Sequence, residues 1–169
     1  MLEIIKFPNP ILRERMPEFD FENPIVDPKQ LEKDMIETML ANNGIGLAAN
    51  QVGVKVRMFV MGQGDTAVGI FNPFVEEAGA PVEDDEGCLS FPWIYSKVKR
   101  PSTIKALWQT SSGEWQSAQL EGITCKCFLH EFDHLEGVVY QDRISPLKWA
   151  LAVKKATKLK RKLTNVGTR

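Results

Sequence analysis

The chain has 169 residues, of which 43% are hydrophobic and 25% are charged, and these values are typical of a globular protein with a sizeable core. Its net charge of −1 gives no overall positive field that would attract nucleic acid. No apolar run approaches the roughly 20 residues that a membrane-spanning helix needs, so composition also argues against a membrane protein.

The first predicted helix covers residues 28–42. Asp27 is its expected N-cap and Pro28 its first helical residue, and the expected stop is Asn43 followed by Gly44. An apolar stripe on this helix is expected to face the core, and it consists of Leu31, Met35, Met39 and Leu40.

Apolar segments after this helix predict short strands at 55–62, 68–75, 102–108 and 114–120. The last two are joined by a turn at 111–113 and are expected to form an antiparallel hairpin. No strand is predicted for the acidic run at 83–86. The segment EGCLSFP at 86–92 is interpreted as small and turn-rich.

A helix over 123–136, ended by Gly137, is apolar around much of its circumference, which predicts a buried, central position. An amphipathic helix is expected from about Ser145, in a region that holds nine Lys and Arg residues between 143 and 169. Its expected anchors to the core are Leu151, Leu159 and Leu163. This order of elements predicts one α+β domain over residues 1–169, with antiparallel sheets wrapped around the central helix and a C-terminal helix.

The central helix contains FLHEFDHLEG, with His130 and His134, the two histidines of the chain. A spacing of four residues stacks two imidazoles on one helical face, about 6 Å apart along the axis, where they can share a metal ion. The alternative is a pair of hydrogen-bonded core histidines. Glu131 favours the metal site, because a buried carboxylate is unfavourable unless a metal or hydrogen bonds compensate it.

A third protein ligand is normally needed. Downstream of the histidines, Glu136 points to a different side of the helix and Asp142 is the last carboxylate before the basic region. A cysteine thiolate is therefore the remaining candidate for the third ligand. Cys127 shares the histidine face but lies in the preceding turn, and Cys125 points to another face, so both are interpreted as buried small residues. Elimination favours Cys88, whose turn-rich segment is free to approach the helix.

The three cysteines show no disulfide framework. The first residues also lack a basic region followed by a long apolar block, so no signal peptide is expected. Both observations predict a reducing cytoplasmic location.

Three motifs together resemble the peptide deformylases. They are GIGLAANQ at 44–51, EGCLS at 86–90 and HEFDH at 130–134, in the order and spacing of that family. The resemblance implies an α+β fold in which three antiparallel sheets surround a metal-bearing helix, with Cys88, His130 and His134 as ligands. It also implies a hydrolase of protein biosynthesis that removes the N-formyl group from the formylmethionine of nascent polypeptides and releases formate.

The resemblance assigns roles to further residues. Glu131 would be the general base, and the Gln51 side-chain amide with the backbone N–H of Leu89 would stabilise the oxyanion. Peptide-binding positions would be Gly44, Ile45, Gly46, Glu86 and Gly87. The residues expected around the methionine side chain are Ile45, Leu89, Ile123 and Cys127, with ordinary core packing as the alternative. Independently of the resemblance, Glu86, Arg100 and Asp133 are expected to support the metal ligands, with a solvated charge as the alternative for each.

Two positions depart from the family pattern. Leu129 stands before the H-E pair, where glutamine is common, and Lys126 stands on the helix where an apolar residue is usual. We therefore expect an altered peptide pocket, with the metal ligands and the base unaffected.

One divalent metal ion is the expected cofactor. A Cys-His-His set suits zinc, iron, cobalt or nickel, and the resemblance implies Fe²⁺ in cells, with Zn²⁺, Ni²⁺ or Co²⁺ in purified protein. The resemblance also implies that the basic terminal helix contacts the ribosome. The alternative is that this helix is basic only because its face is exposed to solvent. The protein is expected to be a monomer. The alternative functions are an H-E-x-x-H metallopeptidase and a non-enzymatic ribosome-associated or RNA-binding protein.

Overall fold

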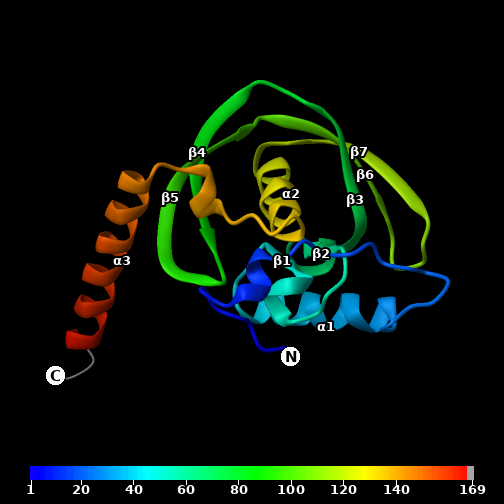
Figure 1. The fold of residues 1–169 in the computed structure, drawn as a ribbon, viewed down its shortest axis with the longest axis horizontal. Helices are drawn as coiled ribbons and strands as arrows, with labels where there is room; N and C mark the ends of the chain where they lie inside the picture. Colours follow the sequence, from blue (N-terminus) through cyan, green and yellow to red (C-terminus); the bar gives the residue numbers. More distant parts are fainter. Residues whose placement is uncertain (167–169) are drawn as a thin grey trace.

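In the computed structural model of the chain, which describes residues 1–166, two antiparallel sheets surround one central helix (Figure 1). The helical elements are η1 (Pro10–Arg13), α1 (Pro28–Ala41), η2 (Ala49–Val52), η3 (Gly64–Thr66), α2 (Gly122–Leu135), η4 (Tyr140–Arg143) and α3 (Pro146–Val166). The strands are β1 (Gly46–Ala48), β2 (Met58–Met61), β3 (Val68–Ala78), β4 (Pro81–Cys88), β5 (Phe91–Pro101), β6 (Thr103–Gln109) and β7 (Trp115–Glu121).

The larger sheet has five strands in the order β1-β2-β3-β6-β7, and the smaller one pairs β4 with β5. Every pairing is antiparallel. The α+β arrangement around a central helix is confirmed, although the residues that the structure describes form two sheets where the resemblance implied three. A search of the same residues finds no helix long and apolar enough to cross a membrane.

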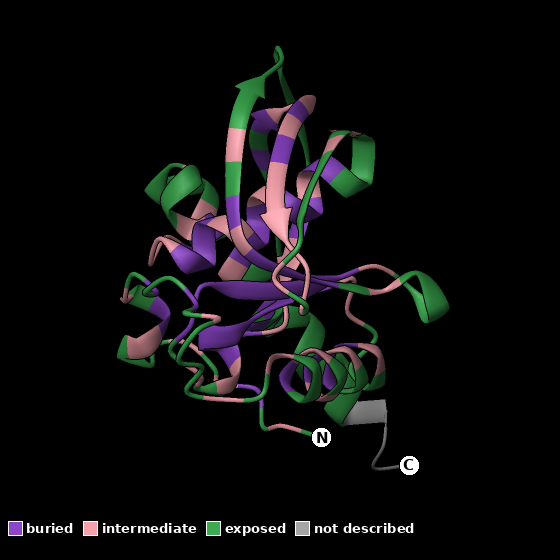
Figure 2. Cartoon of the chain, turned by 90° about the vertical axis from the view of Figure 1, so that its right-hand side faces the viewer, coloured by how far each residue is buried: buried purple, intermediate pink, exposed green. Residues whose placement is uncertain are grey.

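Helix α2 occupies the middle of the molecule, where buried residues gather (Figure 2). It begins at Gly122, directly after β7, and its last residue is Leu135. Gly137 then takes a left-handed conformation with φ 71°, as predicted for the stop. A Cβ at this position would lie 2.5 Å from the carbonyl oxygen of Arg13, so the backbone can pass this close to Arg13 after α2 only with glycine here.

Helix α1 forms as its capping and stop residues predict. The Asp27 carboxylate accepts a hydrogen bond from the backbone N–H of Gln30 at 2.7 Å and caps the helix. Leu31, Met35 and Met39 are buried, whereas Leu40 is partly buried at the edge of the stripe.

Strands β4 and β5 were not predicted. The acidic run lies in β4, where Glu83 pairs with Lys99 and Asp85 with Lys97 across the two strands. Opposite charges at facing positions stabilise an antiparallel pair, so the partner strand compensates for the low strand propensity of the acidic residues.

Helix α3 packs against β5 through small residues. Ala152 and Ala156 are buried, and the Trp149 ring meets Phe91 and Tyr140 edge-on at centroid distances of 5.7 and 5.6 Å. The expectation that leucines anchor this helix is wrong, because the alanine side allows closer approach to the sheet. The three leucines instead face outward, with exposed fractions of 58% for Leu151, 43% for Leu159 and 51% for Leu163.

Candidate metal centre and active site

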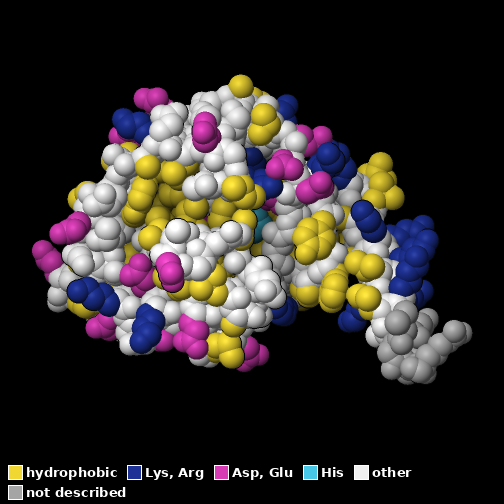
Figure 3. Space-filling model, turned by 180° about the vertical axis from the view of Figure 1, so that it is seen from behind, with side chains coloured by type: hydrophobic (Ala, Val, Ile, Leu, Met, Phe, Trp, Pro, Cys, Tyr) yellow, Lys and Arg dark blue, Asp and Glu magenta, His cyan; other side chains and the backbone are white. Residues whose placement is uncertain are grey.

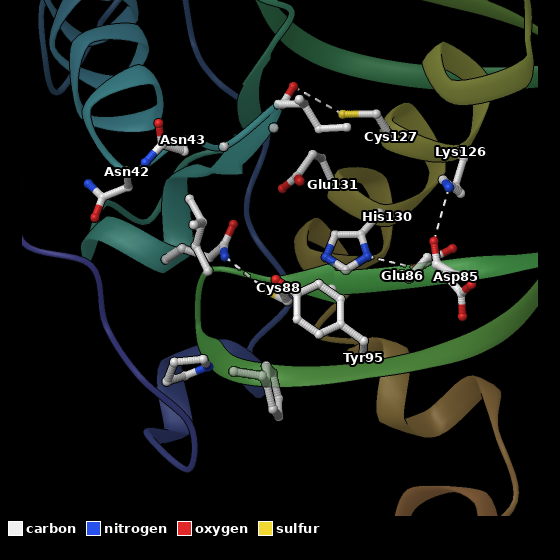
Figure 4. A pocket seen from close by; sticks show the side chains of 18 of the residues that line it. Asn42, Asn43, Asp85, Glu86, Cys88, Tyr95, Lys126, Cys127, His130 and Glu131 are labelled. Carbon is white, nitrogen blue, oxygen red and sulfur yellow. Dashed lines mark hydrogen bonds and ion pairs between the residues drawn. The ribbon is translucent and has the colours of Figure 1, made fainter. Parts of the chain in front are cut away.

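Helix α2 and the end of β4 bring Cys88, His130 and His134 together. One ligand atom from each residue lies within 4.8 Å of the other two. The Cys88 sulfur is 3.3 Å from Nε2 of His134, and the two imidazole centroids are 5.1 Å apart. Figure 4 shows Cys88 close to His130 among the side chains that line the cavity. The structure thus juxtaposes the three side chains that the sequence predicted as ligands.

The other two cysteines do not belong to this cluster. The Cys127 thiol donates to the carbonyl oxygen of Ile45 at 3.2 Å, and burial raises its pKa well above the ordinary value. The Cys125 thiol donates to the carbonyl oxygen of Pro101 at 3.4 Å. Both therefore remain protonated thiols that pack in the core, as the sequence interpretation expected.

Glu86 fixes the orientation of His130. One of its carboxylate oxygens lies 2.9 Å from Nδ1 of His130, which leaves Nε2 for the cluster. Arg100 binds the same carboxylate through two guanidinium nitrogens, one of them at 3.0 Å. Burial alone would raise the pKa of Glu86, but the hydrogen bonds from His130 and Arg100 outweigh it and lower the pKa to about 2.

Arg100 also connects Glu86 to Asp133. Its Nη1 donates to an Asp133 oxygen at 2.8 Å, and Nε of Arg143 donates to the same oxygen at 3.0 Å. The expected support from Glu86, Arg100 and Asp133 is thus a continuous network, in which Asp133 acts through Arg100. The sequence offered no local signal for Arg143, which reaches Asp133 from the segment before α3.

Glu131 is buried beside the cluster, and its Oε2 has no hydrogen-bond partner among the residues the structure describes. Burial raises its pKa to about 7. A Cβ on Gly46 would lie 2.4 Å from Oε1 of Glu131 and 2.7 Å from the Cys127 sulfur. Glycine is therefore required at position 46, because the side chains of Glu131 and Cys127 occupy the space that a Cβ would fill.

The side chain of Gln51 is oriented by three neighbours. Its side-chain oxygen accepts from the Ala48 N–H at 2.8 Å, so its Nε2 points toward the Cys88 sulfur at 3.4 Å and the Ser90 hydroxyl at 3.1 Å. The adjacent carbonyl of Leu89 accepts from the Lys6 ammonium at 2.7 Å. Ser90 and Lys6 were not predicted, because their contacts join segments far apart in the sequence.

A cavity of about 730 Å³ opens over the cluster. On the space-filling surface a histidine is visible at the bottom of this hollow (Figure 3). Every residue predicted to bind the peptide or surround the methionine side chain lines the cavity, namely Gly44, Ile45, Gly46, Glu86, Gly87, Leu89, Ile123 and Cys127. Gln51, Cys88, His130 and Glu131 line it too, whereas His134 lies behind this surface and is 1% exposed.

The cluster fits a divalent transition-metal ion. One cysteine sulfur and two imidazole nitrogens form a donor set that zinc, iron, cobalt and nickel accept, and three protein ligands leave room for a further one. The carboxylate on the far nitrogen of His130 is the support that metal-binding imidazoles usually have.

Comparisons with known proteins place the chain among relatives of one family. The family model for polypeptide deformylase matches residues 1–150. The peptide deformylase of Thermotoga sp. (strain RQ2) is 43% identical over 157 residues, covering 92% of this chain and 94% of the relative. That of Novosphingobium aromaticivorans is 38% identical and covers 94% and 97%. The crystal structure of peptide deformylase from Thermotoga maritima matches with a TM-score of 0.81 at 41% identity, covering 86% of this chain and 99% of that one. A peptide deformylase from Legionella pneumophila matches with a TM-score of 0.87 at 30% identity, covering 97% and 98%.

Replacing Glu86 with glutamine is expected to weaken metal binding about 10- to 100-fold, because the charge that orients His130 is lost. Chelator competition on the folded variant measures this affinity. The matched control is Glu83→Gln on the same strand, since Glu83 is exposed and pairs with Lys148 away from the cluster. Equal affinities for the two variants would contradict the positioning role of Glu86.

Proposed function

This chain belongs to the peptide deformylase family, and we propose that Cys88, His130 and His134 hold its metal ion while Glu131 serves as its general base. The enzyme is a metal-dependent hydrolase that removes the formyl group from nascent polypeptides, releasing formate. The comparisons support neither the metallopeptidase alternative nor the non-enzymatic one. The observation that carries the site assignment is the convergence of three ligand atoms within 4.8 Å, beside a buried carboxylate.

The metal and the protein would divide the chemistry between them. A divalent ion in the cluster supplies Lewis-acid polarisation of the formyl carbonyl and a lowered pKa for the attacking water. Glu86 keeps the His130 ring in place, and Arg100 keeps Glu86 ionised and oriented. The buried network therefore maintains the ligand geometry through the reaction.

Glu131 would accept the proton of the attacking water at Oε2 and deliver it to the departing amine. Its position supports this role: it follows a predicted ligand directly, it lines the cavity, and Oε2 has no competing hydrogen bond within residues 1–166. Gly46 leaves the space in which the carboxylate sits.

Gln51 and Leu89 would bind the oxyanion that develops on the formyl oxygen. The Gln51 amide is fixed by Ala48, so its Nε2 already faces the side of the cluster where Cys88 lies. Donors that are oriented before the reaction stabilise developing charge without reorganisation. The Leu89 backbone contributes from the turn that follows Cys88.

The peptide would lie along the backbone of β1 and of Gly87. β1 is an edge strand of the larger sheet, and an edge strand offers unpaired backbone groups to an extended peptide. Gly44 and Ile45 precede this edge and line the same cavity. The methionine side chain would then extend among Ile45, Leu89, Ile123 and Cys127.

Formate release from a formyl-Met-Ala-Ser peptide tests the proposal. Glu131→Ala is expected to lower kcat/KM by a factor of about 100 to 10,000, because the transition state loses its proton acceptor. Glu77→Ala, an exposed glutamate on β3, should remain fully active. Metal content is measured in both. The assignment fails if metal-loaded Glu131→Ala retains native activity, and no release by the folded native enzyme would refute deformylation itself.

We propose Fe²⁺ as the metal in cells, on the strength of the family resemblance and a donor set that accepts it. Protein loaded with iron under anaerobic conditions should be more active than zinc-loaded protein and should lose activity in air. Activity assays on both forms, with metal content measured, check this expectation. Full activity with zinc and none with iron would contradict it.

We also propose that α3 contacts the ribosome. Six exposed cations on this helix form no ion pair with a carboxylate in the described part of the chain, and they are Lys154, Lys155, Lys158, Lys160, Arg161 and Lys162. Figure 3 shows the cations gathered along this helix. Such a stripe suits the phosphates of ribosomal RNA. Arg169, which was counted in the predicted basic region, lies outside the described residues.

Replacing Lys154, Lys155 and Lys158 with glutamine should reduce co-sedimentation with ribosomes and flatten its dependence on salt, because phosphate contacts are lost. Replacement of Lys29, Lys33 and Lys97, which lie on α1 and β5, serves as a charge-matched control. Hydrolysis of a free formyl peptide should be unchanged in both. Undiminished ribosome binding by the α3 variant would defeat the proposal.

We further propose a monomeric enzyme that acts in the cytoplasm as one catalytic domain with α3 appended. The family's nascent-peptide substrate and the three free thiols support this location. Light scattering of the purified protein checks the monomer.

A further inference from the structure

A second hollow adjoins the substrate cavity. It has a volume of about 420 Å³ and lies between β4, β5 and the first turns of α2. Ile123 and Lys126 line both this hollow and the substrate cavity, so these two side chains form the partition between the two spaces. Part of the second hollow is apolar, with Val82, Val98 and Pro101 in its wall.

Lys126 is held in place by β4. Its ammonium group donates to a carboxylate oxygen of Asp84 at 2.8 Å and to the backbone carbonyl of Asp85 at 3.0 Å. The Lys126 side chain is 19% exposed, whereas that of Asp84 is 63% exposed. Figure 4 shows Lys126 reaching from α2 toward β4. The charge thus sits at the rim while the aliphatic stem crosses between helix and strand.

The position of Lys126 relates it directly to the reacting end of the substrate. Ile123, Lys126 and His130 recur at intervals of three and four residues, so they share one face of α2. Lys126 is one helical turn before His130, a distance of about 6 Å along the axis. The proposed function places the formyl group beside His130 and the methionine side chain beside Ile123 and Cys127, which lie on either side of Lys126 on α2 and line the same cavity, so the first side chain of the peptide would extend toward Lys126.

We propose that Lys126 closes the far end of the methionine pocket and sets the greatest length of first side chain that the enzyme accepts. Its stem forms the wall, and its hydrogen bonds to β4 keep the wall in place. Removal of the stem would join the two hollows and admit longer unbranched side chains. A purely structural ion pair between α2 and β4 would have no effect on the preferred length.

The test uses the full-length, metal-loaded enzyme and formyl peptides that differ in their first residue alone: methionine, 2-aminooctanoic acid or 2-aminodecanoic acid. For Lys126→Ala, the kcat/KM of the 2-aminodecanoic peptide relative to the methionine peptide is expected to rise about tenfold or more, because the added methylenes gain a buried site. Lys126→Met keeps an unbranched stem and should retain the native ratio. Lys97→Ala, which removes a nearby exposed cation that lines neither hollow, is the matched control.

An unchanged ratio in Lys126→Ala would overturn the proposal, and so would a shift in Lys126→Met as large as that in the alanine variant. If Lys126→Ala does not fold, Ile123→Ala opens the same partition at a residue that is 57% exposed, and it must shift the ratio in the same direction. Failure of the proposed function would look different, since the native enzyme would then release no formate from the methionine peptide.

Discussion

Helix α2 buries two imidazoles and two carboxylates, and the surrounding elements supply partners for one of each. His130, Glu131, Asp133 and His134 are each at most 8% exposed. An uncompensated buried charge is strongly unfavourable, so a helix of this kind is stable only if its neighbours supply partners. Glu86 binds His130, and Arg100 joins Glu86 to Asp133. Among the described residues Glu131 keeps a carboxylate oxygen without a partner, at the place where the proposed reaction needs a base.

The paired strands β4 and β5 supply most of this compensation. Glu86 and Cys88 lie two residues apart at the end of β4, where the pairing with β5 shifts register, and both side chains reach the cluster. One of them orients an imidazole and the other joins the proposed ligand set. Arg100 comes from β5, and α3 covers the same pair through Trp149. The proposed ribosome-binding helix therefore packs on the strands that carry the site.

Features with local signals were predicted from the sequence, and features that depend on distant contacts were not. Asp27 and Gly137 mark helix ends through their own chemistry, and the four-residue spacing of the histidines fixes their common face. Strand β4 escaped prediction because the lysines that stabilise it lie on another strand. The α3 leucines suggested the wrong packing face, since the alanines beside them meet β5.

The residues of the site also divide into those that the sequence indicated and those that only the fold brings together. Cys88 could be reached by elimination among three cysteines, because few ligand types remained. Arg143 and Ser90 had no sequence signal, since each contributes through a partner that the fold alone brings near. Lys126 was visible as a departure from the family pattern, but the partition it forms depends on two hollows that only the folded chain has.

X-ray absorption spectroscopy of the zinc-loaded protein counts the sulfur atoms bound to the metal and so tests the proposed ligand set. One sulfur at about 2.3 Å and two imidazole nitrogens at about 2.0–2.1 Å are expected. Cys127→Ser should give the same spectrum, and Cys88→Ser should lose the sulfur contribution. A native spectrum without sulfur, or a sulfur signal that disappears with Cys127 and survives the loss of Cys88, would contradict the proposed metal centre.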